Sequence, residues 1–381
     1  MNFLFDEEPQ ALADSLGKLV DRDYAFEARK AIIGSAAGRS PSTWQAMSEL
    51  GVMLLGLSER AGGFGMGVLD TVPVMEKLGR ALVTEPVVDN LLCARLLDRF
   101  GGQAQLDLLG RVAAGASVLA LAHAETGADD DVARIGLAAS QSGQHWTLTG
   151  DKIMVVHAAS ADALLVSART AGSPGDSQGL SLFLVDPRNK GLTMRTMRTV
   201  DNFRAADIRF SACPAALVGT AGDAFAALDE AVDYATLLLC AEAVGIMEFA
   251  NETTLEYLKT RKQFGVTIGT FQALQHRMVD LVISAQQARS IVYLAGDALD
   301  KAAALPDDAS ARSQRRQQIS AAKIKVGDAA RHIGQESIQL HGGMGMTDEL
   351  NVGHYMKRLM TIDTLFGHAD HHQRRFAALS D

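Results

Sequence analysis

The chain has 381 residues and a formal net charge of −9 at pH 7, with 48% hydrophobic and 21% charged residues. One hydrophobic core rarely serves more than about 250 to 300 residues, so this length predicts two or three domains. The negative charge argues against a nucleic-acid groove, which needs clustered Lys and Arg, and the composition is that of a folded globular protein.

Neither a disulfide framework nor a zinc site is indicated, because Cys93, Cys213 and Cys240 lie far apart without a recognised spacing. The run Met1 to Gln10 carries acids rather than the basic-then-apolar order of a signal peptide. No uncharged apolar stretch reaches the roughly 18 residues of a membrane span. We therefore expect a cytoplasmic protein without a membrane span.

Apolar residues recur at helical spacing from Pro9 to about Ala116, and Ser40 before Pro41 is typical of a helix N-cap. Between about Ser117 and Gly219 the pattern changes to short alternating or β-branched runs separated by Gly and Pro, which favours a barrel or a sandwich. Helical periodicity then returns and predicts three long helices, over Phe225 to Thr260, Phe271 to Ala303 and Ser310 to Leu340.

These patterns predict a mainly α chain with a central β domain. Its expected domains are an all-helical domain over residues 1–116, a β domain over 117–219 and a helical bundle over 220–381.

A possible ligand-binding loop follows the first long helix, where Arg261-Lys262-Gln263-Phe264-Gly265 is followed by Phe271-Gln272. An arginine can pair with phosphate through its fork of donors, glycine lets backbone approach a ligand, and Phe264 can cover an aromatic ring. The alternative is a solvated helix end followed by a tight turn.

A second glycine-rich run, Gln339-Leu340-His341-Gly342-Gly343-Met344-Gly345, ends the third long helix. Glycine commonly ends helices and also admits a ligand close to the backbone. A simple helix stop is the alternative for this motif alone.

Together the two motifs resemble the FAD-binding signatures of the acyl-CoA dehydrogenase family, and the resemblance extends over essentially the whole chain. It implies an N-terminal helical domain, a middle β-barrel and a C-terminal helical bundle. It also implies an acyl-CoA substrate, a trans-2-enoyl-CoA product and electron transfer to an electron-transfer flavoprotein. In the family the first motif holds the pyrophosphate and adenine of FAD, partly across a subunit boundary. We therefore expect an oligomer, at least a dimer or a tetramer built from two dimers.

The β domain resembles the family with substitutions. The family run Thr-Glu-Pro-x-x-Gly-Ser-Asp, which lines the flavin and the acyl-CoA, reads here with Ala124, Thr126 and Asp130 in place of its Thr, Pro and Ser. In the next motif Met154 replaces a Trp that packs on the flavin, and Val156 replaces a Thr that donates a hydrogen bond to it. Valine cannot donate, and a carboxylate at position 130 repels nearby phosphates.

The resemblance implies contacts to FAD by Leu121, Ala124, Gly127, Met154, Val156, Arg261, Gln263, Phe264, Phe271, Gln272, Gln339, Gly342, Gly343, His368 and Asp370. It implies contacts to the substrate by Asp130, Asp233 and Thr236. The His and Asp residues from His368 to His372 are possible metal ligands, but a solvated helix start or FAD contacts explain them more simply, and we expect no metal.

The family's catalytic base is missing. Most members place a glutamate in a Tyr-Glu-Gly-Thr run, where this chain has Phe366, and a minority place it at the position of Ala235. Asp363 is a weak candidate for a substitute, since a surface carboxylate is the alternative.

Three functions stay open. The leading one is a dehydrogenase that resembles the small subunit of bacterial enzymes for dicarboxyl (pimeloyl-CoA), branched or steroid-derived acyl-CoA, either as a homo-oligomer or as an α2β2 heteromer whose paralogous subunit contributes the glutamate. The second is a non-catalytic subunit that completes the FAD pocket of such a partner. The third is an acyl-CoA flavoenzyme with chemistry other than dehydrogenation.

Overall fold

The computed structural model describes residues 7–100 and 102–379, and residues 1–6 of the run Met1 to Gln10 lie outside them. It has two compact units, Met1–Arg29 with Gly67–Val83 and Thr236–Asp381, and Lys30–Met66 with Thr84–Ala235. The division falls inside two helices, α2 (Phe26–Gly34) and α7 (Phe225–Thr260). The three domains expected from the sequence stay a prediction.

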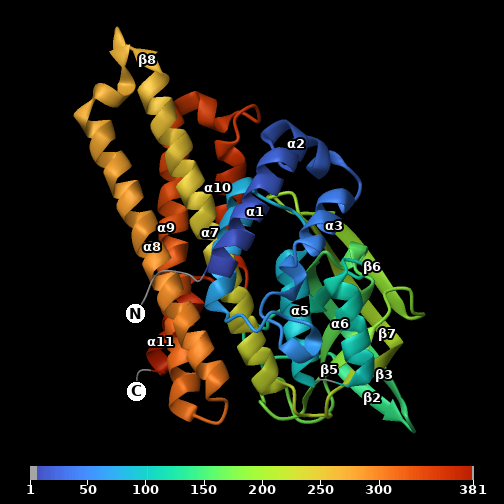
Figure 1. The fold of residues 1–381 in the computed structure, drawn as a ribbon. Helices are drawn as coiled ribbons and strands as arrows, with labels where there is room; N and C mark the ends of the chain where they lie inside the picture. The colour runs from blue at the N-terminus through green and yellow to red at the C-terminus, as the bar shows by residue number, and fades with distance from the viewer. Residues whose placement is uncertain (1–6, 101, 380–381) are drawn as a thin grey trace. The chain divides into compact units, whose positions relative to one another are not determined.

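The first unit is a helical bundle around α9 (Figure 1). The helix α9 packs against α8, α10 and α11, and α1 packs against α4. The predicted helical bundle is confirmed, and the three long helices begin and end within one residue of their expected bounds. The helices of this unit besides α7 are α1 (Glu7–Asp23), α4 (Val72–Ala81), α8 (Gln272–Ala304), α9 (Ala309–His341), α10 (Val352–Thr364) and α11 (Ala369–Ala378), with short 3-10 helices at Leu69–Thr71, Ile268–Thr270 and Gly342–Met346.

Local chemistry sets the ends of these helices. Asp308 caps α9 by accepting from the backbone N–H of Ser310 at 2.8 Å. After α7, the strands β8 (Lys262–Gln263) and β9 (Val266–Thr267) form a β-hairpin with a two-residue turn. This hairpin lies at the end of the α7–α8 pair (Figure 1). Its turn residues Phe264 and Gly265 have φ of 53° and 81°, as a type I′ turn requires. Phe264 thus adopts a left-handed conformation that is uncommon for residues other than glycine.

Two glycines bring α4 and α7 into backbone contact. A Cβ atom added to Gly79 would lie 2.0 Å from the carbonyl oxygen of Glu242, and one added to Gly245 would lie 1.9 Å from the carbonyl oxygen of Glu76. Real Cβ atoms do not approach so closely, so both positions require glycine.

The second unit contains a closed β-barrel. Strands pair in the ring β4–β2–β3–β7–β5–β4, while β1 runs parallel to β4 and β6 pairs with β7. Its strands are β1 (Leu119–Ala122), β2 (Ala138–Ser142), β3 (His145–Val156), β4 (Ala163–Arg169), β5 (Leu180–Val185), β6 (Leu192–Arg198) and β7 (Arg204–Val218). Its helices are α3 (Pro41–Glu49), α5 (Val87–Phe100) and α6 (Gln103–Ala113), with 3-10 helices at Val52–Leu54, Glu59–Ala61 and Ala158–Ser160.

The barrel core consists of side chains that alternate along the strands, including Leu148 and Val155 of β3 and Phe210 of β7. The expected N-cap is present before α3, where the Ser40 side chain accepts from the backbone N–H of Thr43 at 3.3 Å. The central β domain predicted from the sequence is therefore confirmed as a barrel.

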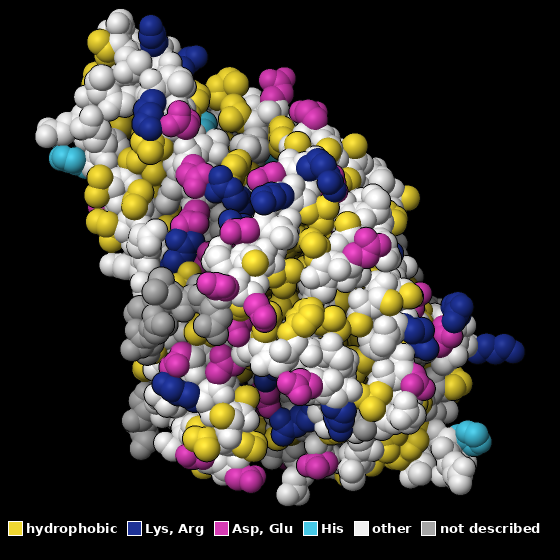
Figure 2. All heavy atoms as spheres, viewed as in Figure 1, with side chains coloured by type: hydrophobic (Ala, Val, Ile, Leu, Met, Phe, Trp, Pro, Cys, Tyr) yellow, Lys and Arg dark blue, Asp and Glu magenta, His cyan; other side chains and the backbone are white. Residues whose placement is uncertain are grey.

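Among the described residues, no helix has the combination of length and hydropathy that crossing a bilayer requires. Figure 2 shows hydrophobic side chains gathered along α8. On this helix Val279, Val282 and Ile283 are 55%, 45% and 48% exposed. Such a cluster of exposed apolar side chains commonly marks an interaction surface.

Candidate functional site

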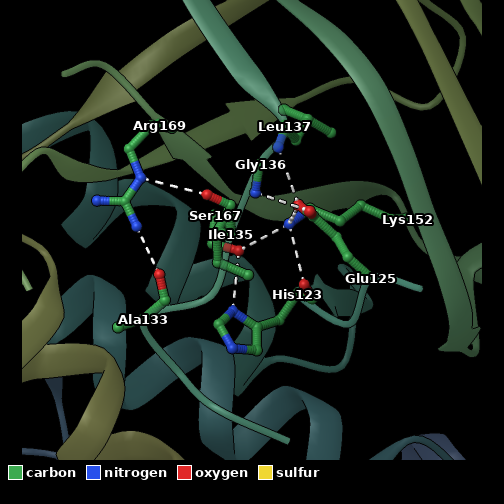
Figure 3. Close-up of polar contacts among 9 residues, drawn as sticks. All are labelled: His123, Glu125, Ala133, Ile135, Gly136, Leu137, Lys152, Ser167 and Arg169. Carbon is green, nitrogen blue, oxygen red and sulfur yellow. Dashed lines mark hydrogen bonds and ion pairs between the residues drawn. The ribbon is translucent and has the colours of Figure 1, made fainter. Parts of the chain in front are cut away.

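A buried lysine organises the segment that follows β1 (Figure 3). Lys152 of β3 is fully buried, and its ammonium donates to Glu125 Oε1 at 2.7 Å, to the carbonyl oxygen of His123 at 2.9 Å and to Ser167 Oγ at 3.1 Å. All three ammonium protons thus have an acceptor, which is what a buried cation needs.

The Glu125 carboxylate also holds the loop that leads into β2. It accepts from the backbone N–H of Gly136 at 2.8 Å and of Leu137 at 3.1 Å. The guanidinium of Arg169 holds the same loop from its other side by donating to the carbonyls of Ala133 and Ile135 (Figure 3). The loop over residues 125–137 is therefore fixed by charged side chains through its backbone donors and acceptors.

Burial changes the acid–base properties of this cluster. It lowers the pKa of Lys152 to about 8, although the Glu125 carboxylate opposes the change. Burial, together with the nearby Lys152 cation, lowers the pKa of His123 to about 3. His123 is therefore neutral at pH 7 and too weakly basic to serve as an effective proton acceptor. The hydrogen bonds of Lys152 and Glu125 position the backbone of this loop.

The expected flavin-lining residues around this cluster differ in exposure. Ala124 and Gly127 are exposed on the loop, whereas Leu121 is buried in β1 at 8% exposed. The carbonyl of Ala124 accepts from the backbone N–H of Ile153 at 2.9 Å, which joins the loop to β3. Asp130 is exposed with a φ of 62°. Its carboxylate is thus presented to solvent on a left-handed turn.

Met154 is displaced from the regular strand by a bulge. The register of β3 against β7 shifts between Lys152 and Val155, and Met154 has a φ of 51° with 45% of its surface exposed. Its backbone N–H donates to Asp207 Oδ1 at 3.1 Å. Val156, two residues later, is half-buried at the end of the strand.

In the first unit, a pocket of about 570 Å³ brings the two glycine-containing motifs together. In the sequence, more than seventy residues separate Arg261 and Gln263 from Gln339, Gly342 and Gly343, yet all five line this pocket. The pocket is lined by these five residues with Tyr257, Ile268, Leu274, Arg277, Leu340, His341 and Met344. Five of the expected cofactor residues therefore share one pocket.

The other expected residues of the first motif lie outside that lining. Phe264 is 90% exposed on the hairpin turn, and Phe271 is 39% exposed with its ring edge toward Phe264 at a centroid distance of 6.2 Å. Gln272 is exposed at the start of α8. These apolar rings are open to solvent within this chain.

The motif position 341 carries a histidine that the sequence reasoning did not single out. The His341 ring is 2% exposed and stacks on Tyr257 with a centroid distance of 4.4 Å. Its Nδ1 lies 2.8 Å from the carbonyl oxygen of Ser337, and its Nε2 is buried without a hydrogen-bond partner among the described residues. The only sign of this histidine in the sequence was that a polar side chain lies inside a motif expected to bind a ligand.

The turn at the expected base position is firmly held. Phe366 and Gly367 have φ of 54° and 95°, directly after α10. The buried Lys323 ammonium donates to the carbonyls of Ile362 and Leu365, and His372 Nε2 lies 2.9 Å from the Phe366 carbonyl. Because a carbonyl only accepts, the imidazole is the donor. The backbone of this turn is thus set by side chains other than that of Phe366.

The Asp363 carboxylate forms an ion pair with an arginine. It is 6% exposed, and its Oδ2 pairs with Arg331 at 3.0 Å. Its Oδ1 is buried without a hydrogen-bond partner among the described residues. The ion pair with Arg331 occupies one carboxylate oxygen, which supports a structural role for Asp363.

The remaining expected residues lie on α7 and around the start of α11. Asp233, Ala235 and Thr236 are buried, at 1%, 0% and 1% exposed. His368 precedes α11 and Asp370 lies in its first turn, both exposed.

Comparison with known proteins adds to this geometry. Family models of the acyl-CoA dehydrogenase N-terminal, middle and C-terminal domains match residues 6–134, 120–213 and 222–378. The mitochondrial isovaleryl-CoA dehydrogenase of Pongo abelii is 27% identical over 365 residues, which cover 92% of this chain and 83% of that protein.

Two solved structures extend the comparison. A structure described as a Tcur3481-Tcur3483 steroid ACAD variant is 28% identical, with a TM-score of 0.86 over 98% of both chains. A structure described as PigA with FAD and proline is 25% identical, with a TM-score of 0.87 over 99% of this chain and 98% of that one.

Proposed function

The chain belongs to the acyl-CoA dehydrogenase family of FAD-dependent oxidoreductases, and on this premise we propose that it takes part in the α,β-desaturation of an acyl-CoA thioester. The electrons pass to an electron-transfer flavoprotein. The observation that carries the proposal is the pocket in which Arg261 and Gln263 meet Gln339, Gly342 and Gly343.

The residues of this pocket fit the adenosine diphosphate half of FAD. The Arg261 guanidinium and the amides of Gln263 and Gln339 offer donors to phosphate oxygens. A Cβ added at Gly342 or Gly343 would meet nothing within 4 Å, so the backbone there is open to a ligand. When bound, FAD supplies the hydride acceptor, and the protein supplies position and proton transfer.

In the barrel unit, we assign the flavin-facing role to Ala124, Gly127, Met154 and Val156. The bulge that exposes Met154 presents a flexible, polarisable side chain where the family motif has Trp. Val156 offers only apolar contact in place of a hydrogen bond. A flavin bound here would therefore lack one donor that the family normally provides.

For the substrate, we assign contacts to Asp130, Asp233 and Thr236. The exposed Asp130 carboxylate would repel the phosphates of coenzyme A, so coenzyme A thioesters should bind more weakly than with the family's serine at this position. The buried Asp233 and Thr236 offer polar groups on α7.

A second candidate function follows from the missing base. Position 366 is a phenylalanine on a fixed turn, position 235 is a buried alanine, and Asp363 is paired with Arg331. These observations support a subunit that completes the FAD pocket of a paralogous chain and relies on it for the glutamate. They also leave room for acyl-CoA chemistry that needs no α-carbon base.

Oligomerisation is part of the proposal. The exposed Phe264 and Phe271 and the apolar face of α8 need a partner surface, and a second copy or a paralogue would cover them. The proposed assembly is a dimer, a tetramer or an α2β2 heteromer, located in the cytoplasm.

The test is the visible spectrum of the chain expressed alone, followed by anaerobic titration with a panel of acyl-CoA thioesters. Bound FAD that bleaches with one thioester would support dehydrogenation by this chain. Bound FAD without bleaching, or FAD binding only after a glutamate-bearing paralogue is added, would support the accessory role. A chain that binds no FAD under either condition would contradict both.

A further inference from the structure

The second unit has a pocket of about 470 Å³ of its own, and none of its lining residues belongs to the pocket of the first unit. Its walls come from α5, from the start of α7 and from the loop that carries Arg60. Three arginines line it, Arg60, Arg95 and Arg99, together with the acids Asp98 and Glu230. Three positive and two negative side chains leave one positive charge in excess, in a chain whose net charge is −9. Such a local excess attracts anions to this part of an acidic protein.

Arg95 is held in place by three contacts. Its Nη2 donates to Glu230 Oε1 at 2.8 Å, its Nη1 donates to the Gly56 carbonyl at 3.3 Å, and its guanidinium carbon lies 5.0 Å from the centre of the Tyr234 ring. Arg99, one turn further along α5, donates through Nη1 to the other oxygen of Glu230. Glu230 thus fixes two guanidinium groups at one wall of the pocket, while its single charge balances only one of them.

Arg60 and Arg99 keep donors that no residue in the described part of the chain accepts. Arg60 donates through Nη2 alone, to the carboxylate and the backbone carbonyl of Asp98, and Arg99 donates through Nη1 alone. Asp98 is further occupied by Ser58, whose backbone N–H and hydroxyl donate to it at 2.9 and 2.8 Å. A guanidinium carries five N–H groups in a planar fork. Because the two arginine side chains are 55% and 47% exposed, their remaining N–H groups are accessible to a ligand in the pocket.

We propose that this pocket binds the phosphoryl group of a small molecule, with Arg60 and Arg99 as hydrogen-bond donors and Arg95 as a fixed positive charge beside them. A phosphoryl group offers three or more acceptor oxygens and a charge of about −1.5 to −2 near pH 7, so it can accept from two forks at once. A carboxylate has two oxygens and one charge. The volume of the pocket leaves room for the body of a small phosphate ester.

The experiment titrates the full-length chain with inorganic phosphate, with glycerol 2-phosphate and with acetate, and measures dissociation constants by calorimetry. The ionic strength is kept at about 20 mM, where exposed charges are weakly screened. We expect both phosphates to bind, and acetate to bind about tenfold more weakly because it offers fewer acceptors and less charge. The tighter of the two phosphates tells whether the pocket prefers an ester or the free ion.

Two variants each remove one guanidinium with open donors. Arg60→Gln and Arg99→Gln should each weaken phosphate binding about tenfold, as the loss of a charge-assisted hydrogen bond at a partly exposed site predicts. Glu230→Gln raises the excess charge of the lining from one to two and should tighten binding about tenfold, a change that damage to the fold cannot produce. Arg188→Gln is the matched control, because Arg188 is 86% exposed and lies outside the pocket, and it should leave every constant unchanged.

Any one of three results would overturn the inference. The wild-type chain binds neither phosphate, or it binds acetate as tightly as phosphate, or the variants at Arg60 and Arg99 bind phosphate as tightly as the Arg188 control. FAD binding should stay unchanged in all four variants, since none of the substituted residues lines the pocket of the first unit. The phosphoryl site and the proposed function therefore stand or fall separately.

Discussion

Replacing Lys152 by Met removes the buried ammonium while keeping a long unbranched side chain. The substitution leaves Glu125, the His123 carbonyl and Ser167 without their shared donor. Breaking a buried ion pair from one side costs about 3–5 kcal/mol. Glu125 keeps two backbone donors and is 15% exposed, so we expect the lower end, about 3 kcal/mol.

The assay is thermal unfolding followed by circular dichroism. At about 2–4 °C per kcal/mol for a domain of this size, the melting temperature should fall by roughly 6–12 °C. Lys190→Met, at an exposed position, is the control and should change stability by less than about 0.5 kcal/mol. In a double-mutant cycle, Lys152→Met and Glu125→Gln should show a coupling of about 1–3 kcal/mol.

The pH dependence gives a separate readout. Because the pKa of Lys152 is lowered to about 8, the unfolded chain binds more protons than the folded chain between pH 8 and the usual lysine value. Stability from this group therefore rises with pH in that window, by at most about 1.4 kcal/mol per unit, and Lys152→Met should lose the rise. Additive single-mutant effects, or a loss below about 1 kcal/mol, would refute the reasoning.

Three further predictions concern the first unit. Phe366→Glu places a carboxylate on a turn whose backbone is held by other residues, so thioester-dependent bleaching of FAD should exceed that of the unaltered chain. Phe366→Gln, which adds no carboxylate, should give no such gain, and equal spectra for both variants would contradict the assigned position. Burial lowers the pKa of His372 to about 3, so its contribution to stability should be lost as pH falls from about 6.5 toward 3, and His372→Asn should flatten the melting temperature in that range. Arg358→Met leaves the buried Glu242 carboxylate without its two donors at 2.6 and 2.8 Å and should cost about 3–5 kcal/mol in urea unfolding, against a negligible change for Arg188→Met at the surface.

The helices were accessible from sequence because their periodicity is local. The third long helix begins at an Asp cap and ends at Gly342, and both signals are written in a few consecutive residues. Closure of the barrel could not be predicted in the same way, since the β2–β4 and β5–β7 pairings join residues about thirty or more positions apart in sequence. The pattern predicted strands in a barrel or a sandwich, and the pairing decided between them.

The candidate site likewise has features that the sequence could predict and features that it could not. The resemblance led to Arg261 and Gln339, and the structure places both in one pocket, which spacing alone could not predict. The burial of His341 and its bond to the Ser337 carbonyl depend on packing that the motif does not encode. Similarly, nothing in the sequence says that Glu125 is the acid that reaches Lys152, 27 residues away.

The paired glycines of α4 and α7 also constrain how this lineage can change. At Gly79 and Gly245 the opposing atoms are main-chain carbonyls, so no second side-chain substitution can make room for a larger residue. Alleles with Ala at either position would need the two helices to separate, and suppressor mutations should be rare there. In an alignment of close homologues, the two positions should therefore stay glycine together, or change together along with a different crossing of these helices.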